Sequence, residues 1–160
     1  MLEKLKSFIK RLNESGMLDD NRYLSSAIII SEADKLDSAK WQADFYSPFE
    51  HNIKSFVDNK EIEVKCSQEI FQKHKQTLSE LDLSKVKLGF KSLIEKLNEL
   101  KPKNDLIIKY IIILQVIENV TVWNITVLTL SLKVWNIKFN AETSEVISNR
   151  VDTINSFRPR

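Results

Sequence analysis

The stretch Leu5-Lys6-Ser7-Phe8-Ile9-Lys10-Arg11-Leu12-Asn13-Glu14 returns later in the chain as Phe90-Lys91-Ser92-Leu93-Ile94-Glu95-Lys96-Leu97-Asn98-Glu99. Six of the ten positions keep the same residue, and the two copies are 85 residues apart. A tryptophan recurs at nearly the same spacing, because Trp41 and Trp123 are 82 residues apart. An internal repeat decides the architecture before any local pattern does. The sequence therefore predicts two similar units.

Both copies place apolar residues at the three- and four-residue spacing that marks one face of a helix. The apolar face of the first copy is Leu2, Leu5, Phe8, Ile9 and Leu12, and that of the second is Val86, Phe90, Leu93, Ile94, Leu97 and Leu100. We predict that Ser84 caps the start of the second helix, because a serine hydroxyl can accept from the free amide groups there. Ser15-Gly16 and the run 101–105, which contains Pro102, are predicted to end the two helices.

Runs of apolar or alternating residues follow each helix and predict antiparallel strands. They cover 23–30, 41–46, 53–57 and 62–64 in the first half, and 107–116, 120–127, 134–139 and 146–147 in the second. The run 107–116 is almost continuously apolar, which is typical of a central strand. Residues 68–80 are polar and are predicted to form a short helix or an ordered linker between the halves.

These patterns predict an α+β fold of two similar units, each an amphipathic helix packed on a curled antiparallel β-meander. The expected boundaries are 1–66 for the N-terminal unit (a degenerate copy), 67–81 for a helical linker, 82–150 for the C-terminal unit and 151–160 for a tail. Two such units can form one continuous sheet or two sheets packed face to face, and the sequence does not choose between them.

The composition is that of an ordinary globular protein, with 160 residues of which 42% are hydrophobic and 29% charged. A net charge of +2 without a basic cluster gives no reason to expect a nucleic-acid partner. The chain has two glycines and neither a GxGxxG nor a Walker sequence, which excludes the glycine-rich phosphate-binding loops.

Residue types that carry catalysis or bind metals are scarce. Cys66 is the single cysteine, so no disulfide can form within the chain, and it is expected as a half-buried strand residue. His51 and His74 lack the spacing of a metal site and are expected at the surface. We therefore predict no catalytic residues, no metal site and no cofactor.

The N-terminal twelve residues carry charges every few positions, so no secretory signal is visible. The longest apolar stretch, 106–116, is shorter than the roughly 20 residues of a membrane-spanning helix. We expect no membrane insertion. The expected location is cytoplasmic, or extracytoplasmic if a leader was removed.

Aromatic residues concentrate on the predicted strands, at Trp41, Phe45, Tyr46, Phe49, Phe56, Trp123, Trp135 and Phe139. Strand aromatics usually pack a core, and most of these are expected there. The Ser47-Pro48 break bends the strand that precedes it. We predict that the residues at this bend, Tyr46, Pro48, Phe49 and His51, contact a protein partner.

Three stretches of the second half carry a resemblance to a known family. They are the helix 86–94, the strand Val122-Trp123-Asn124-Ile125-Thr126 and the run 135–147, which contains the turn Asn140-Ala141-Glu142-Thr143-Ser144-Glu145. This half resembles the PepSY domain, whose closing hairpin is usually a strand, Asp-Ala-x-Thr-Gly-x and a short strand. Asn140 and Ser144 stand where that pattern has Asp and Gly. The likeness spans about 82–148, and the repeat implies a degenerate copy over 2–66.

The resemblance implies a small helix-plus-sheet module that binds or inhibits another protein and has no catalytic residues. PepSY domains occur in protease propeptides and in envelope proteins. We therefore expect a non-enzymatic protein-binding module, in a more specific version an inhibitor or immunity-type protein that blocks a toxin or a peptidase.

Other classes of function stay open. One is an enzyme or small-ligand carrier with a site between helix and sheet. Another is a structural subunit of an assembly, or a homo-oligomer, in which long apolar strands pair between chains. Sheets of this kind bind partners through a face or through an edge strand.

Overall fold

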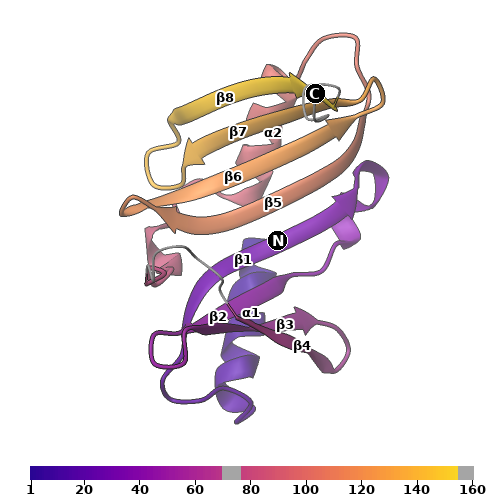
Figure 1. The fold of residues 1–160 in the computed structure, drawn as a ribbon. Coiled ribbons are helices and arrows are strands. Elements are labelled where there is room, and N and C mark those ends of the chain that lie inside the picture. Colours follow the sequence, from indigo (N-terminus) through magenta and orange to yellow (C-terminus); the bar gives the residue numbers. More distant parts are fainter. Residues whose placement is uncertain (70–76, 155–160) are drawn as a thin grey trace, which may run out of the picture.

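The computed structural model describes the backbone of residues 1–69 and 77–154, and the side chains of 1–65 and 77–154. Each half of the chain is a helix followed by four strands (Figure 1). The first half consists of α1 (Leu2–Glu14), β1 (Tyr23–Glu32), the short 3₁₀ helix η1 (Ala33–Ser38), β2 (Gln42–Ser47), β3 (Asn52–Asp58) and β4 (Ile62–Glu69). The second consists of η2 (Leu83–Lys85), α2 (Phe90–Leu100), β5 (Ile107–Ile117), β6 (Val120–Thr129), β7 (Lys133–Asn140) and β8 (Val146–Thr153).

The eight strands form one antiparallel sheet in the order β4-β3-β2-β1-β5-β6-β7-β8. β1 and β5 join the two halves, and Ser26 to Glu32 pair with Gln115 to Lys109. The α+β class is therefore confirmed, and of the two arrangements that the sequence left open the continuous sheet is found. β5 lies in the middle of this sheet, as the continuous apolar run predicted.

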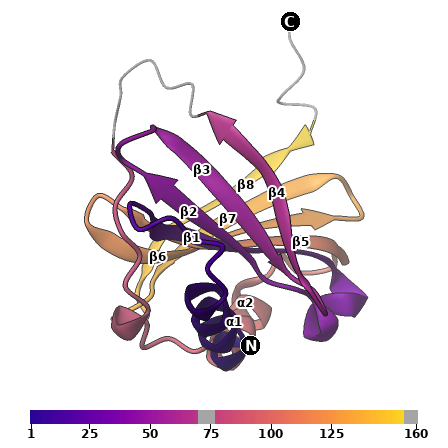
Figure 2. The ribbon, with the colours of Figure 1, turned by 90° about the horizontal axis from the view of Figure 1, so that it is seen from below.

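Both helices lie on the same face of the sheet, and the core fills the space between them and the strands (Figure 2). α1 buries Leu5, Phe8 and Leu12, and α2 buries Phe90, Leu93 and Leu97. Each residue of the first set is 85 positions from its counterpart in the second, so the repeat in sequence is also a repeat in packing. Full burial of such a side chain contributes roughly 1.5–3 kcal/mol, which holds both helices on the sheet.

Trp41 and Trp123 meet in this core, with ring centroids 6.4 Å apart. Phe90 lies edge-on to both, at 6.3 Å from Trp41 and 6.2 Å from Trp123. Each indole N–H donates to a backbone carbonyl near the start of a helix, from Trp41 to Met1 at 2.9 Å and from Trp123 to Leu88 at 3.0 Å. A buried tryptophan needs such a partner for its N–H, so these bonds fix where each helix begins on the sheet.

The second helix begins later than predicted. α2 starts at Phe90 with Gly89 as its N-cap residue, while Ser84 lies in η2. The prediction that Ser84 caps this helix was wrong. The Asp82 carboxylate accepts from the Ser84 amide at 2.9 Å and closes a separate short turn before the helix.

The linker and the last strand also differ from their predicted bounds. Residues 68–80 were predicted as a short helix or an ordered linker. β4 continues to Glu69 and residues 77–80 are not helical, while residues 70–76 lie outside the described part. β8 continues past Ile147 to Thr153, which takes three residues from the predicted tail. Its backbone pairs with β7 from Lys133 to Phe139, while its side chains are mostly exposed. Such an edge strand lacks the alternation of apolar and polar residues that reveals strands in a sequence.

Candidate functional site

The face of the sheet opposite the helices is left uncovered by the described helices (Figure 2). Ile28 and Ile30 of β1 lie there, directly opposite Ile113 and Ile111 of β5. Ile30 is 57% exposed, and the other three isoleucines are half-buried. Large apolar side chains grouped on a solvent-facing sheet surface indicate a surface that a partner covers. We call Ile28, Ile30, Ile111 and Ile113 the isoleucine patch.

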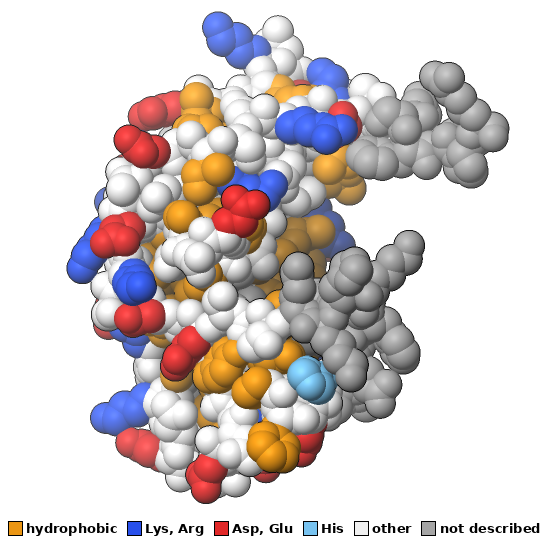
Figure 3. All heavy atoms as spheres, turned by 60° about the vertical axis from the view of Figure 1, so that its left-hand side comes forward, with side chains coloured by type: hydrophobic (Ala, Val, Ile, Leu, Met, Phe, Trp, Pro, Cys, Tyr) orange, Lys and Arg blue, Asp and Glu red, His pale blue; other side chains and the backbone are white. Residues whose placement is uncertain are grey.

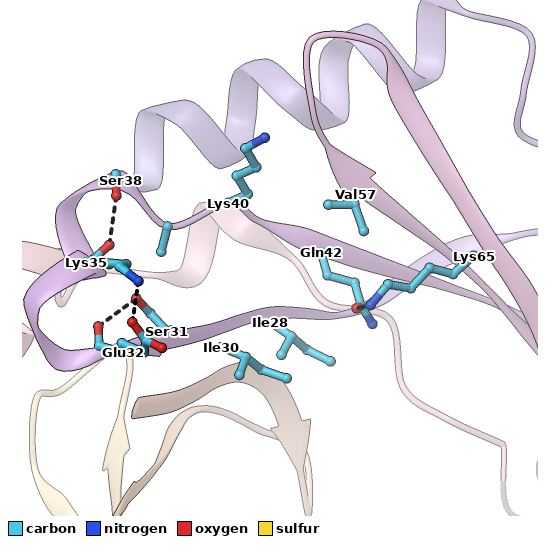
Figure 4. Close-up of a pocket in the computed structure, with 11 residues that line it drawn as sticks. Ile28, Ile30, Ser31, Glu32, Lys35, Ser38, Lys40, Gln42, Val57 and Lys65 are labelled. Carbon is cyan, nitrogen blue, oxygen red and sulfur yellow. Dashed lines mark hydrogen bonds and ion pairs between the residues drawn. The ribbon is translucent and has the colours of Figure 1, made fainter. Parts of the chain in front are cut away.

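The isoleucine patch borders a hollow of about 480 Å³ that extends from β1 towards β4. Ile28, Ile30 and Val57 give this hollow an apolar floor, and Lys35, Lys40 and Lys65 stand around it (Figure 4). The space-filling view also shows the molecule hollowed on the side of the uncovered face (Figure 3). An apolar floor with charged groups at the rim is the usual composition of a binding site.

The three lysines around the hollow are neutralised to different degrees. Lys35 forms an ion pair with Glu32, and this contact holds the pKa of the Glu32 carboxyl below its usual range and that of Lys35 above it. Lys65 donates to the side-chain carbonyl of Gln42 at 2.6 Å, and Lys40 donates to that of Asn59. Amides carry no charge, so these hydrogen bonds leave the positive charges of Lys40 and Lys65 available to an acidic ligand.

Polar side chains flank the isoleucine patch in the N-terminal half of the sheet. Asp44, 8% exposed, accepts from the Ser26 hydroxyl at 3.2 Å and from the Gln42 side-chain amide at 2.9 Å. These bonds satisfy a carboxylate that lies almost out of contact with water.

The C-terminal half has a similar polar row. The Asn136 side-chain amide donates to Asn124 at 2.9 Å and to Thr126 at 3.0 Å, and Lys138 donates back to Asn136 at 3.0 Å. These side chains are half-buried and hold each other in place. The uncovered face is therefore apolar at its centre and polar on both sides.

The bend predicted to contact a partner is the turn between β2 and β3. The structure brings two of its four residues together, since the Tyr46 hydroxyl lies 3.3 Å from His51 Nδ1. Tyr46 is 1% exposed and offers almost no surface, whereas Pro48 and His51 are exposed and Phe49 is 85% exposed. The turn therefore presents Phe49, while Tyr46 supports it from below.

A buried arginine fixes this turn, and sequence reasoning did not find it. The Arg22 side chain is 1% exposed and donates to Glu50 and Asn52, each at 2.7 Å, and to Asp19 at 3.1 Å. It thereby ties the loop after α1 to the β2–β3 turn. Asp19 also pairs with Lys54 at 2.7 Å, and Lys54 and Arg22 together hold the pKa of the Asp19 carboxyl below its usual range.

A second hollow, of about 560 Å³, opens between α1 and the segment that leads to η2. Ile9 and Asn13 line it from the helix, Tyr23 and Phe45 from the strands, and Glu80 from the segment. It mixes apolar and polar groups and gives access to the edge of the space between helix and sheet.

Cys66 and His74 were the other reactive side chains considered in the sequence. Both side chains lie outside the described part of the structure. Within the described residues, no group of three or more His, Cys, Asp or Glu side chains is placed to hold a metal ion. No helix among the described residues is long and apolar enough to span a membrane.

No family model and no curated protein matches the chain. Among solved structures, the crystal structure of a putative lipoprotein from Clostridium difficile 630 is similar, with a TM-score of 0.58 and 12% sequence identity, over 92% of this chain and 90% of that one. At this identity the likeness concerns the fold alone. Over its described residues the chain is thus an α+β protein with one eight-stranded antiparallel sheet and two α-helices, similar in fold to that lipoprotein.

Proposed function

We propose that the chain is a non-enzymatic binding protein whose uncovered sheet face takes up a segment of another protein. The observation that carries this proposal is the hollow in which Ile28 and Ile30 form an apolar floor beneath lysines. Covering exposed apolar surface contributes about 25 cal/mol per Å², so Ile30 supplies part of the affinity. Lys40 and Lys65 supply the selectivity, because they favour an acidic segment over a basic one.

The polar rows beside the isoleucine patch support a polypeptide as the ligand. The Gln42 amide donates to Asp44 and accepts from Lys65, and Asn124 accepts from Asn136, so Gln42 and Asn124 each keep a further donor and acceptor position that a peptide backbone can use. The Phe49 turn provides a second contact, in line with the partner site expected at Tyr46, Pro48, Phe49 and His51. An inhibitor or immunity-type role is the specific version of this proposal.

We further propose that the two halves descend from one duplicated PepSY-like unit. The 85-residue repeat and the shared order of one helix and four strands support this origin. The similarity in fold to a lipoprotein supports, weakly, a place outside the cytoplasm.

The second candidate function is a small-ligand carrier, and the hollow beside α1 favours it. Glu80, Asp82 and Lys85 line this hollow together with the apolar Ile9. Such a mixture suits a small amphipathic molecule. A thermal shift produced by a small molecule and abolished by Ile9→Glu would support it.

A crosslinking experiment tests the leading proposal. A photoreactive residue is placed at position 30, in the hollow, or at position 151, where β8 exposes another β-branched side chain to 47%. We expect one protein of the native host to crosslink in stoichiometric amounts at position 30 and not at position 151. A Lys40→Glu/Lys65→Glu variant should lose that product. Equal labelling at the two positions, or none at position 30, would contradict the proposal.

A further inference from the structure

One end of the sheet carries three exposed leucines on two neighbouring turns. Leu106, 67% exposed, lies between α2 and β5, and Leu130 and Leu132, 63% and 56% exposed, lie between β6 and β7. The Leu130 amide donates to the Leu106 carbonyl at 2.8 Å, so the two turns lie side by side (Figure 1). We call these three residues the leucine end.

The backbone conformation of Leu132 makes a leucine at this exposed position unusual. Its φ is +62°, in the left-handed region, and its amide closes the turn by donating to Thr129 at 3.1 Å. In a three-residue hairpin loop this position normally takes glycine, because a side chain strains the left-handed conformation. A leucine at this position is neither buried nor in a favourable backbone conformation, so it does not stabilise the fold. A strained, exposed apolar residue indicates a functional role.

The leucine end stands on a rigid base. The Asp105 side chain is 6% exposed and accepts from the Leu106 amide at 3.0 Å and from the Ser131 amide at 3.3 Å. The Ser131 hydroxyl also donates to it and is the main reason why the pKa of the Asp105 carboxyl lies below its usual range. Asp105 thereby fastens the two turns together, and the leucines keep fixed positions.

Three lysines surround the leucine end. Lys101 and Lys103 share a shallow hollow of about 440 Å³ with Leu106, and Lys133 follows Leu132 in the chain. Glu99 lines the same hollow, whereas Asp105 is almost fully covered and lies 3.9 Å from Lys133. Lys133 is thus paired with Asp105, and Lys101 and Lys103 outnumber Glu99, so the unpaired charge beside the leucines is net positive.

We propose that the leucine end docks on an anionic lipid surface. Apolar side chains at protruding turns can enter the boundary between headgroups and acyl chains, and lysines around them are attracted to anionic headgroups. A protein partner fits less well, because Leu is under-represented among the hot spots of protein interfaces. This docking uses a surface other than the isoleucine patch and is independent of the function proposed above.

Co-sedimentation with vesicles tests the proposal on the full chain. Vesicles of phosphatidylcholine alone are compared with vesicles that also contain phosphatidylglycerol. We expect binding to the anionic vesicles that weakens as salt rises, since salt screens exposed charges. Leu130→Ser/Leu132→Asn should weaken binding about tenfold through lost apolar contact, and Lys101→Gln/Lys103→Gln should weaken it about fivefold for each lysine.

Two features keep the test decisive. Leu132→Asn relieves the strained backbone, because asparagine tolerates the left-handed region, so this change should not unfold the protein. The matched control is Phe49→Ser, which removes an 85% exposed apolar residue from the β2–β3 turn, the counterpart of the β6–β7 turn in the repeat. In Figure 1 that turn lies at the opposite end of the sheet. We expect Phe49→Ser to bind vesicles like the wild type.

Several outcomes would overturn the proposal. They are equal binding of the wild type to both vesicle types, unchanged binding by Leu130→Ser/Leu132→Asn, and an equal loss in Phe49→Ser. If the leucine variant keeps vesicle binding and instead loses a captured protein, the leucine end is a protein interface and the lipid proposal fails.

Discussion

Ile28 lies directly opposite Ile113 across the β1–β5 pair, and the two residues are 85 positions apart. The same offset separates the two helices, so a residue of the first unit pairs with its own counterpart in the second. In an antiparallel pair this happens only at the point where a two-fold axis crosses the sheet. An axis perpendicular to the sheet places both helices on one face, as observed, and the two units therefore share a single core.

The shared core predicts that equivalent cavities in the two halves have equivalent effects. Leu12→Ala and Leu97→Ala remove fully buried side chains at corresponding positions of α1 and α2. Each should lower the free energy of unfolding by about 2–5 kcal/mol, the usual cost of such a cavity. Urea unfolding followed by circular dichroism should show one transition in both variants. Two separate transitions would mean that the halves unfold as independent units.

The surface positions Lys10 and Glu95 provide the control, because they too are 85 residues apart and both are exposed. Lys10→Ala and Glu95→Ala should change the free energy of unfolding by no more than about 0.5 kcal/mol. A larger effect at either position would show that the cavity argument is not specific to the core.

Much of this fold could be predicted from local pattern. The repeat and the helical spacing indicated both helices, and the apolar run 107–116 indicated the central strand. The joining of the halves was not predictable, because β1–β5 pairing depends on contacts more than 70 residues apart in sequence. The prediction that Ser84 caps the second helix was wrong for a local reason, because the Ser84 amide donates a hydrogen bond to the Asp82 carboxylate in a separate turn.

The candidate site was harder to predict than the fold. Ile28-Ile29-Ile30 is continuously apolar, so its pattern does not reveal that Ile29 is buried while Ile30 is solvent-exposed. The hollow forms only when strands from separate parts of the chain lie side by side. Arg22 gave no sequence signal, since its partners Glu50 and Asn52 are about thirty residues away. Of the predicted bend, Tyr46 is buried, whereas Pro48, Phe49 and His51 are exposed.

The β5–β6 turn predicts a stabilising substitution. Glu118 and Asn119 both have positive φ, 49° and 64°, which defines the tight hairpin turn that favours Asn followed by Gly. Asn119→Gly should therefore raise the free energy of unfolding by about 0.5 kcal/mol, because glycine relieves the residual strain. Thermal unfolding measures this change. Asn124→Gly, in the middle of β6, is the control and should destabilise; a loss of stability in Asn119→Gly would contradict the turn geometry.

Arg22 should contribute more to the free energy of unfolding than an exposed arginine does. Arg22→Met keeps the apolar stem but removes the donors to Glu50, Asn52 and Asp19. We expect the free energy of unfolding to fall by about 2 kcal/mol, because the charge-assisted hydrogen bonds of Arg22 are lost. The half-exposed carboxylates of Asp19 and Glu50 can then hydrogen-bond to water instead. Arg150→Met, at an arginine whose side chain is 76% exposed, should cost less than about 0.5 kcal/mol. Chemical denaturation compares the two variants. Equal losses in the free energy of unfolding would contradict the proposal that the buried Arg22 side chain stabilises the fold.

The Asp19 carboxylate predicts how stability depends on pH. Hydrogen bonds and charge from Lys54 and Arg22 hold its pKa in the folded protein below the usual value, about 3.9 in an unfolded chain. A lowered folded pKa means that the carboxylate stabilises the fold above the unfolded pKa, and that this contribution is lost as the pH falls through the folded pKa. Asp19→Asn should therefore be less stable than the wild type at pH 6, and the difference should shrink below about pH 4. Urea unfolding at pH 6, 4 and 3 measures it, with Asp20→Asn as the control for a lost carboxylate in the same loop. A difference between Asp19→Asn and wild type that stays constant from pH 6 to pH 3 would show that Lys54 and Arg22 do not stabilise the folded protein through this charge.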